Sequence, residues 1–186
     1  MVSLMQLWLP IVLSAVLVFV MSTLIHMVFK WHNAEYHGLS NEAEVAAAIR
    51  KGNAAPGQYM IPYCADMKEM GSEAMQQKFK EGPIALLTLR APGPPAMGAS
   101  LGQWFVFNLV VGLFAAYIAS RTLLPQTDYL HVFRVVSTVG FLTYVGGDVP
   151  AAIWMGKPWS AVAKDALDGL IYGLLMGGAF GWLWPR

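Results

Sequence analysis

The stretch LWLPIVLSAVLVFVMSTLIHMVF at residues 7–29 decides the class of fold, because none of its 23 residues is Lys, Arg, Asp or Glu. A helix needs about 20 predominantly apolar residues to cross a hydrocarbon core of roughly 30 Å. A cleavable signal peptide would instead begin with a basic region and carry a shorter apolar run. Residues 7–29 are therefore predicted to form a retained first transmembrane helix.

Three further apolar blocks follow at residues 101–120, 130–153 and 166–184, each long enough for one span. All seven tryptophans lie at the edges of the four blocks: Trp8, Trp31, Trp104, Trp154, Trp159, Trp182 and Trp184. Amphipathic rings favour the two membrane–water interfaces, whereas a soluble core would not place every Trp at a helix end. The sequence thus predicts four transmembrane helices with both chain ends on one side of the bilayer.

The composition agrees with a membrane protein and argues against other classes. Of the 186 residues, 56% are hydrophobic, which is too many for an ordinary water-soluble domain. The formal net charge of +1 gives no basic field that would attract nucleic acid, so the lipid bilayer is the partner that composition predicts. The single cysteine, Cys64, excludes a disulfide within the chain.

Residues 30–100 form the segment that is polar enough for a water-exposed fold. Asn41 and Ser72 are candidate N-caps of helices within it. The pattern predicts two helices and two strands, at residues 42–51 and 72–81 and at residues 58–63 and 84–90. The predicted fold is therefore an α-helical integral membrane protein with four transmembrane helices and a small α+β extramembrane cap between helices one and two.

The basic residues near the ends of the spans favour a cytoplasmic cap. On the side of the cap they are Lys30, Arg90, Lys157 and Lys164, and on the side of the chain ends they are Arg121, Arg134 and Arg186. Cytoplasmic segments carry the excess of Lys and Arg in membrane proteins. The difference is one residue, and it predicts that the chain ends lie outside the cytoplasm.

The last apolar block carries four glycines at a constant spacing of four residues: Gly169, Gly173, Gly177 and Gly181. Such a stripe lets another helix approach closely, as in small-xxx-small packing. Each glycine costs a helix about 1 kcal/mol relative to Ala in water, so the repetition indicates a contact. Packing against a span of the same chain is favoured because three partners are already tethered, and a homo-oligomer interface is the alternative.

Ionisable residues gather at the cap-side ends of the spans, and the middle of the predicted bundle has no charge. The candidate ligand-binding residues there are His26, His32, His37, Asp148, Asp165 and Asp168, with Lys157 beside them. Asp165 and Asp168 are expected in the first turn of the last span, where carboxylates complement the helix dipole. Gly146-Gly147 predicts a kink before Asp148. The group is interpreted either as a salt-bridge network that docks the cap or as a metal or small-ligand site.

Sulfur-containing side chains are frequent in the cap segment. The candidate metal ligands among them are Met60, Cys64, Met67 and Met70, followed by Met75. Thiolate and thioether groups suit Cu(I). Methionine is also a common gap-filler, and no CxxC or HxxxH pairing accompanies this group, so a copper site rests on composition alone.

The sequence shows no catalytic signature of the GxSxG, Walker, HExxH or GxGxxG type in a suitable context. It also lacks the paired broken helices and inverted repeats that are typical of transporters. No reaction, substrate or cofactor follows from the residues.

Several segments resemble a bacterial family of uncharacterised small polytopic inner-membrane proteins. They are Lys30–Tyr59, Glu81–Pro83, Ile153–Trp159 and Phe180–Arg186. The similarity extends over nearly the whole chain and implies the bacterial inner membrane as the location. That family has no assigned activity, so the resemblance implies no cofactor, substrate or site residue.

Two functional hypotheses follow. The first is a non-enzymatic accessory or scaffold protein of the membrane, whose partner is another membrane protein or a second copy of itself. It rests on the missing catalytic motifs, the glycine stripe and the uncharged middle of the bundle. The alternative is a membrane-embedded metal or cofactor binder that uses His26, His32, His37 and Asp148. A channel or transporter is disfavoured because the sequence shows no polar path through the bundle.

Overall fold

The computed structural model describes residues 2–186, which fold as two units. The first unit, called the bundle below, comprises the chain up to His37 together with Ala96–Arg186. The second unit, the cap, comprises Gly38–Pro95. The compact part of the predicted extramembrane segment 30–100 is thus Gly38–Pro95, and the segment that carries His32 packs with the bundle.

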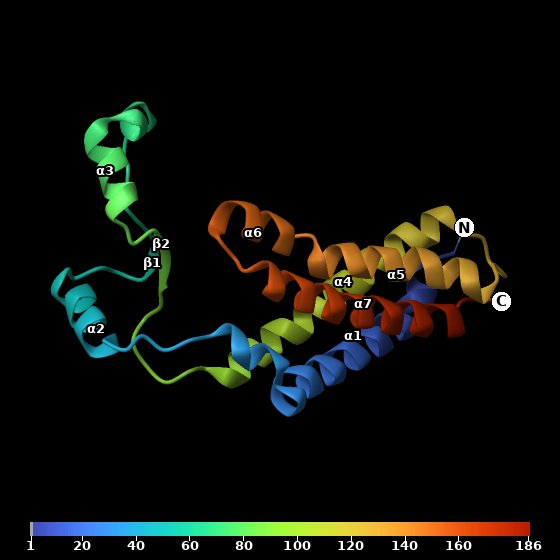
Figure 1. Cartoon of the computed structure of the whole chain (residues 1–186). Helices are drawn as coiled ribbons and strands as arrows, with labels where there is room; N and C mark the ends of the chain where they lie inside the picture. Colours follow the sequence, from blue (N-terminus) through green and yellow to red (C-terminus); the bar gives the residue numbers. More distant parts are fainter. Residues whose placement is uncertain (1) are drawn as a thin grey trace. The chain divides into compact units, whose positions relative to one another are not determined.

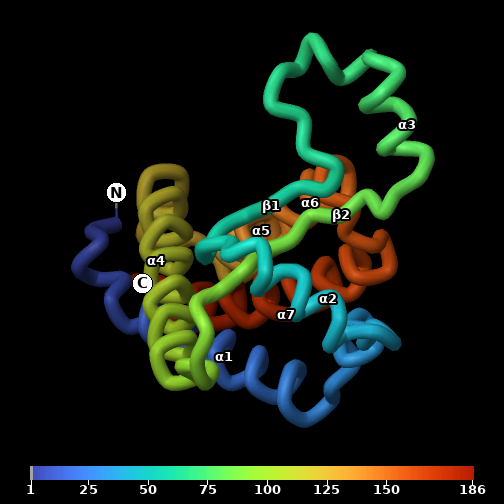
Figure 2. The backbone as a smooth tube through the Cα atoms, turned by 90° about the vertical axis from the view of Figure 1, so that its left-hand side faces the viewer, coloured from blue at the N-terminus to red at the C-terminus, as the bar shows by residue number. Residues whose placement is uncertain are grey.

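The bundle consists of four long helices and several short helical segments. In chain order they are η1 (Leu4–Leu7), α1 (Trp8–Thr23), the π-helical η2 (Leu24–Phe29), η3 (Trp31–Glu35), α4 (Met97–Thr122), α5 (Tyr129–Val145), α6 (Asp148–Met155) and α7 (Trp159–Trp182). Helix α5 packs on α7, and α1 packs on both α4 and α7. Figures 1 and 2 show the four long helices side by side, with the start of α1 and the end of α7 at the same end of the bundle.

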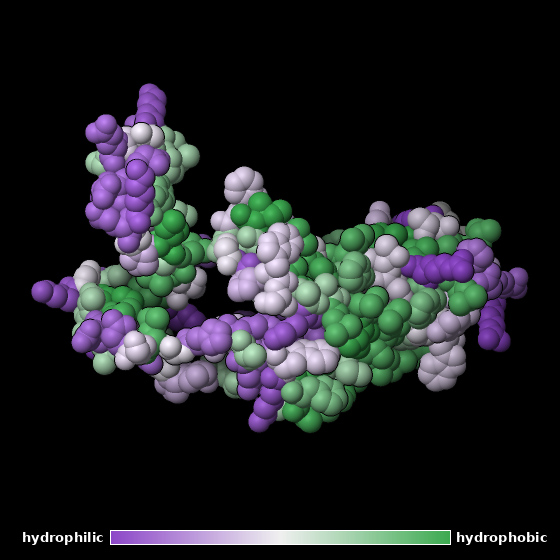
Figure 3. Space-filling model, viewed as in Figure 1, coloured by the Kyte–Doolittle hydropathy of each residue, from purple (hydrophilic) through white to green (hydrophobic). Residues whose placement is uncertain are grey.

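Three helical stretches are long and apolar enough to cross a membrane: Leu4–Phe29, Met97–Thr122 and Tyr129–Met155. Helix α7 is of similar length but is less apolar, because it contains Lys164, Asp165 and Asp168 as well as its glycines. Figure 3 shows apolar surface over the middle of the bundle, with hydrophilic residues toward its ends. These lengths and compositions are those of a helical membrane protein.

The third and fourth predicted spans differ from the observed helices. Helix α5 ends at Val145, and α6 begins only at Asp148, so the block 130–153 is interrupted at the predicted Gly146-Gly147 break. Helix α7 begins at Trp159, directly after Pro158, and not at Ala166. The helix thus begins before the predicted span, and the charged residues Lys164 and Asp165 continue it.

The glycine stripe of α7 lies against α5 of the same chain. A Cβ atom added at Gly173 would lie 2.7 Å from the carbonyl oxygen of Ser137, and one added at Gly177 would lie 2.7 Å from that of Phe133. Opposite Gly173, α5 itself has Gly140. The two backbones are therefore nearly in contact at Gly173 and Gly177, whereas Gly169 and Gly181 lie closest to side chains of α5, those of Val145 and Tyr129.

The tryptophans do not all lie on the bundle surface. Trp8, Trp154, Trp159 and Trp182 are exposed. Trp184 is only 5% exposed, and its indole N–H donates a hydrogen bond to the carbonyl of Leu124 at 3.0 Å. A ring that is held inside the bundle does not reach an aromatic belt, so the prediction for Trp184 is wrong.

The cap consists of α2 (Glu42–Lys51), β1 (Gly57–Ile61), η4 (Met67–Gly71), α3 (Glu73–Glu81) and β2 (Ala85–Leu89). The two strands pair antiparallel, from Gly57 opposite Leu89 to Ile61 opposite Ala85. Ser72 caps α3 as predicted, since its hydroxyl oxygen accepts from the backbone N–H of Met75. Asn41 precedes α2 but its side chain makes no capping hydrogen bond, because its backbone (φ −114°, ψ 34°) is not in the extended conformation of an N-cap.

Candidate functional site

Two irregular helical segments at the end of α1 position the histidines of the site. His26 lies in the π-helical η2, and His32 lies in the 3₁₀ segment η3. Lys30 separates them and adopts a left-handed backbone conformation (φ 54°) that turns the chain back. Isolated π-helical turns are frequent at functional sites because they re-aim side chains.

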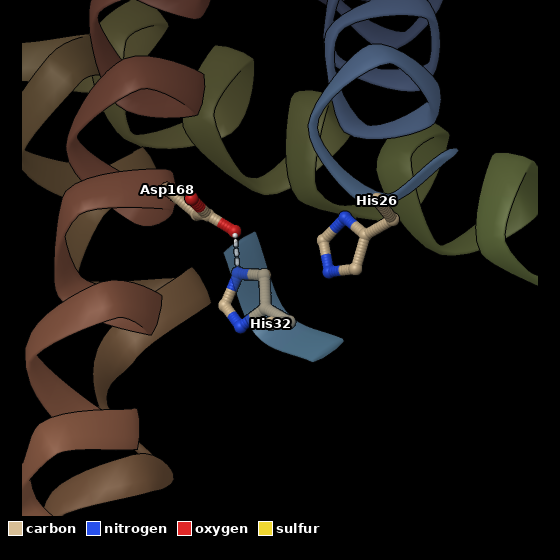
Figure 4. A group of neighbouring side chains, drawn as sticks. All are labelled: His26, His32 and Asp168. Atoms are coloured by element: carbon tan, nitrogen blue, oxygen red, sulfur yellow. Dashed lines mark hydrogen bonds and ion pairs between the residues drawn. The ribbon is translucent and has the colours of Figure 1, made fainter. Parts of the chain in front are cut away.

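His32 lies between two carboxylates, those of Glu35 and Asp168, and Figure 4 shows the contact with Asp168. Its Nε2 is 2.8 Å from Oδ2 of Asp168 on α7, and its Nδ1 is 3.0 Å from Oε1 of Glu35. A neutral imidazole has a single N–H to donate. The two hydrogen bonds therefore require either an imidazolium ion or a protonated carboxyl group.

His26 stacks on His32 but has different hydrogen-bond partners. The ring centroids are 4.8 Å apart and the ring planes are nearly parallel, at 3°. Nδ1 of His26 is 3.0 Å from the carbonyl oxygen of Ser22. Because a carbonyl can only accept, Nδ1 carries the proton, and Nε2 of a neutral His26 has a free lone pair.

Two lysines complete the cluster. Nζ of Lys164 is 3.2 Å from Oε1 of Glu35 and donates to the carbonyl of Trp31 at 2.7 Å. Nζ of Lys157 bridges Asp148 and Asp165 at 2.6 and 2.7 Å. We call these eight side chains the rim site: His26, His32, Glu35, Asp148, Lys157, Lys164, Asp165 and Asp168.

The ion pairs shift two pKa values outside the membrane-spanning helices. Burial raises the pKa of Glu35, but the hydrogen bonds and charges of Lys164 and His32 outweigh it, and the pKa is lowered overall. Burial lowers the pKa of Lys157, but the hydrogen bonds and charges of Asp148 and Asp165 outweigh it, and the pKa is raised overall. Both groups are therefore held in their charged forms.

The rim site carries more negative than positive charge. It has four carboxylates and two ammonium groups, and the proton that His32 and its two carboxylate partners require leaves one negative charge in excess. Carboxylates at the edge of a membrane bundle are costly unless they are paired. The excess therefore favours the binding of a cation.

A pocket of about 310 Å³ opens beside the rim site. Residues from α1, η2, α4, α5, α6 and α7 line it, among them His26, Trp104, Tyr144, Asp148, Asp168 and Tyr172. Apart from Oδ2 of Asp165, which is ion-paired with Lys157, two buried oxygen atoms of lining residues have no partner, Oδ1 of Asp168 and the hydroxyl of Tyr172. Since buried polar groups are normally paired, these two atoms are unpaired groups that a ligand in the cavity would satisfy. We call this cavity the rim pocket.

The structure brings together five of the six candidate residues from the sequence. His26, His32, Asp148, Asp165 and Asp168 all belong to the rim site, with Asp165 Oδ1 4.0 Å from Nδ1 of His32. His37 is exposed and lies outside both the ion pairs and the pocket. The expected first-turn position of Asp165 and Asp168 is wrong, because α7 begins at Trp159 and both lie further along it.

Sequence reasoning missed Glu35 and the aromatic lining. Glu35 follows His32 by three residues, a spacing that brings two side chains to one face of a helix, so the signal was present. Trp104 was interpreted as an interface anchor, yet its N–H donates to the hydroxyl of Ser22 at 2.8 Å inside the bundle. Tyr144 and Tyr172 lie within apolar blocks and carried no signal of their own.

The sulfur-rich stretch belongs to the cap. Met60 lies on β1, Cys64 follows it in a loop, and Met67 and Met70 lie in η4. The thiol of Cys64 donates to the carbonyl of Asp66. The structure therefore gives that thiol a local backbone partner, and a copper site stays a prediction from composition.

His26, His32 and Asp168 each offer a ligand atom, and these atoms lie within 4.8 Å of one another. Imidazole and carboxylate suit several divalent transition metals. The lone pair of an imidazole lies in the plane of its ring, however, and the two parallel rings share no point in their planes. Coordination by both histidines would need one ring to turn and the His32–Asp168 hydrogen bond to open.

No protein-family model matches the chain, and neither a curated protein nor a solved structure matches it. The fold and the site thus define a class by themselves: a helical protein with membrane-spanning character and a polar pocket at one end of its bundle.

Proposed function

We propose that the protein crosses the bacterial inner membrane four times and binds a small cationic ligand in the rim pocket. The observation that carries this proposal is the Oδ1 atom of Asp168, a carboxylate oxygen without a partner on a residue that is 4% exposed. A carboxylate oxygen in that position is stabilised by a positive charge or a hydrogen-bond donor. The excess negative charge of the rim site acts in the same direction.

The fourth span is part of the proposal. Helix α7 has 24 residues, a length of about 36 Å at 1.5 Å per residue. Its charged residues are paired within the bundle: Lys164 with Glu35, Asp165 with Lys157, and Asp168 with His32. Charges within membrane segments are typically paired in this way. Both chain termini lie at the same end of the bundle, which also supports an even number of spans.

A location in the bacterial inner membrane rests on the sequence resemblance, and the cytoplasmic cap rests on the positive-inside bias. Helix α6, which begins with Asp148 of the rim site, lies at the end of the bundle opposite the chain termini (Figure 1). In this orientation the rim pocket faces the cytoplasm, and its ligand would be drawn from that side or from the cytoplasmic leaflet.

Ligand binding is better supported than a scaffold role based on self-association. The glycine stripe was the main sequence feature in favour of a homo-oligomer, and it packs on α5 of the same chain. The rim pocket, by contrast, has unpaired polar atoms that packing does not explain. The scaffold hypothesis therefore keeps the missing catalytic motifs and the uncharged middle of the bundle as support.

The test is a ligand screen by thermal unfolding of the purified protein in detergent. The panel contains Zn²⁺, Mn²⁺, ethylammonium and tetramethylammonium, with phosphate as an anionic control, and elemental analysis of the purified protein is run beside it. A ligand at 100 times its Kd stabilises by about 2.7 kcal/mol. We expect stabilisation by at least one cation and none by phosphate.

Two matched variants locate the binding. Asp168→Asn removes the charge that faces the pocket, and Asp128→Asn removes an exposed charge at the other end of the bundle while keeping a good N-cap for α5. The stabilisation should be lost in the first variant and kept in the second. If no cation stabilises the wild-type protein, or if Asp168→Asn responds as the wild type does, the proposed function is wrong.

A further inference from the structure

The rim pocket has an aromatic wall that metal binding would not use. Trp104, Tyr144 and Tyr172 all line the pocket and contact one another. Their ring centroids are 5.2 to 6.4 Å apart and their planes are inclined by 57° to 75°. Several ring faces and edges thus converge on one cavity, from α4, α5 and α7.

The remaining lining includes three carboxylates. Asp148, Asp165 and Asp168 line the pocket, whereas Lys157 and Lys164 do not. The ammonium groups therefore compensate the carboxylates from outside the cavity. A ligand in the pocket meets carboxylates and aromatic rings together, and this combination recognises organic cations.

We propose that the ligand of the rim pocket carries a protonated primary amine, an inference that rests on the proposed cation binding and names its chemical class. The N–H groups of a primary ammonium ion donate to Oδ1 of Asp168 and to the hydroxyl oxygen of Tyr172, the two buried atoms without partners. The charge lies against the aromatic wall at the same time. A quaternary ammonium ion has no N–H and leaves both oxygens unpaired.

The size of the pocket and the histidine stack favour this class over a metal ion. A volume of about 310 Å³ lies at the lower end of the range for organic ligands, and a metal ion with three protein ligands needs far less. The parallel planes of His26 and His32 hold their lone pairs away from a common point. The site as it stands is built for an organic group and needs rearrangement for a metal.

The ammonium group has two possible sources, a free small amine and the headgroup of phosphatidylethanolamine. In both cases the group that enters the pocket is the same. The experiment therefore has one arm for each source. Each arm compares a primary with a quaternary ammonium group: ethylammonium with tetramethylammonium, and phosphatidylethanolamine with phosphatidylcholine.

In the first arm, binding of ethylammonium, tetramethylammonium and Zn²⁺ to the detergent-purified protein is measured by calorimetry. In the second arm, thermal unfolding is compared in nanodiscs of phosphatidylethanolamine and of phosphatidylcholine with the same acyl chains. We expect ethylammonium to bind more tightly than tetramethylammonium. If the headgroup is the source, phosphatidylethanolamine nanodiscs stabilise the protein and reduce the binding of free ethylammonium. If a free amine is the source, the two lipids give equal stability and ethylammonium binds in both.

Tyr172→Phe is the decisive variant, because the hydroxyl that it removes has no partner in the free protein. Loss of an unpaired buried hydroxyl should leave the unliganded protein as stable as before or more so. The affinity for the primary amine should fall about tenfold or more, as for a hydrogen bond to a charged group. The affinity for tetramethylammonium should change little.

Replacement of Trp104 by Leu provides the second variant. Loss of one cation–π contact should lower the affinity for ethylammonium and for tetramethylammonium alike, by about 2- to 30-fold. Tyr129→Phe, on the opposite end of the bundle, is the control and should change neither affinity.

Four results would overturn the inference. Tetramethylammonium binding as tightly as ethylammonium would remove the role of the N–H donors, and full affinity in Tyr172→Phe would place the amine elsewhere. Binding of Zn²⁺ without any binding of amines would leave the proposed function standing and refute the amine. If neither ammonium ions nor metals bind, both the inference and the proposed function fail.

Discussion

His32 and Asp168 are hydrogen-bonded at 2.8 Å although 136 residues separate them in the chain. Both side chains are nearly buried, at 11% and 5% exposure. The bond ties the segment after the first long helix to the middle of α7, and Glu35 holds the other nitrogen of the same imidazole. The rim site is thus fixed by a pair whose members come from the two ends of the sequence.

Breaking this pair from one side should be costly. His32→Leu leaves Asp168 buried without a partner, and loss of one member of a buried ion pair typically costs about 3–5 kcal/mol of unfolding free energy. In the double variant His32→Leu/Asp168→Leu no charge is left behind, so the loss should be smaller than the sum of the two single losses. A double-mutant cycle from denaturant unfolding in detergent measures the difference. Additivity of the two single effects within about 0.5 kcal/mol would show that the pair is not coupled.

The class of the fold follows from the sequence because hydrophobic length is a one-dimensional property. The uninterrupted apolar run before Lys30 predicts a helix that the structure places at Leu4–Phe29, since η1, α1 and η2 run on from one another. Ser72 likewise caps α3, because a cap depends on neighbours within three residues. The start of α7 was missed because Lys164 and Asp165 find their partners in distant segments, which no local pattern records.

The sequence predicts the site only in part, for a similar physical reason. Topology places His26, His32 and Asp168 at the same end of the bundle, and the sequence is sufficient for that. Which side chains then face one another depends on the rotation of each helix about its axis. The π-helical turn that re-aims His26 and the aromatic wall beside Asp168 depend on that rotation, and apolar periodicity in a membrane segment does not define it.

Glu35 should make the bundle less stable in acid. Its pKa is lowered below the ordinary value of 4.5 because the contacts with Lys164 and His32 outweigh burial. A carboxylate with a depressed folded-state pKa contributes stability above its ordinary pKa, and this contribution is lost as the pH falls through the lowered value. The unfolding free energy should therefore decrease with falling pH below 4.5.

Glu35→Gln isolates this contribution. The variant should be less stable than the wild type near neutral pH and should approach the wild type in strong acid, where Glu35 is protonated. Chemical unfolding of the wild type and the variant, near neutral pH and in strong acid, measures the two stability differences. Glu42→Gln in the cap is the control. A stability gap that stays constant with pH would mean that the charge of Glu35 contributes nothing.

Trp184 should act as an internal anchor for the end of α7. Its indole N–H donates to the carbonyl of Leu124, and the backbone N–H of Gln126 donates to the carbonyl of Pro185 beside it. Trp184→Phe keeps a buried ring and removes one of three donors to the carbonyl of Leu124, which still accepts from the hydroxyl and the backbone N–H of Thr127. The loss should therefore be that of a single hydrogen bond, about 0.5–1.5 kcal/mol. Trp182→Phe, at a position that is 71% exposed, should change the unfolding free energy by less than about 0.5 kcal/mol. Equal effects of the two substitutions in thermal unfolding would place Trp184 among the surface residues.

The contact between α5 and α7 gives the sharpest test of the fold, because two glycines of α7, Gly173 and Gly178, have different surroundings. A Cβ atom at Gly173 would lie 2.7 Å from a backbone oxygen and 3.0 Å from a backbone nitrogen of α5, so the helices must separate to admit it. A Cβ atom at Gly178 would meet only the hydroxyl of Tyr129, at 3.8 Å, which is ordinary contact. Both substitutions by Ala improve helix propensity by the same amount, about 1 kcal/mol.

Gly173→Ala should therefore lower the unfolding free energy by about 1–3 kcal/mol, the usual cost of overpacking, while Gly178→Ala should leave it unchanged or raise it. The loss in Gly173→Ala should be independent of protein concentration, because the stripe packs within the chain. Unfolding at two protein concentrations, together with the molecular mass in detergent, measures both quantities. A folded Gly173→Ala monomer of full stability that has lost an oligomer would instead assign the stripe to an interface between copies of the chain, and the packing of α7 on α5 would have to be revised.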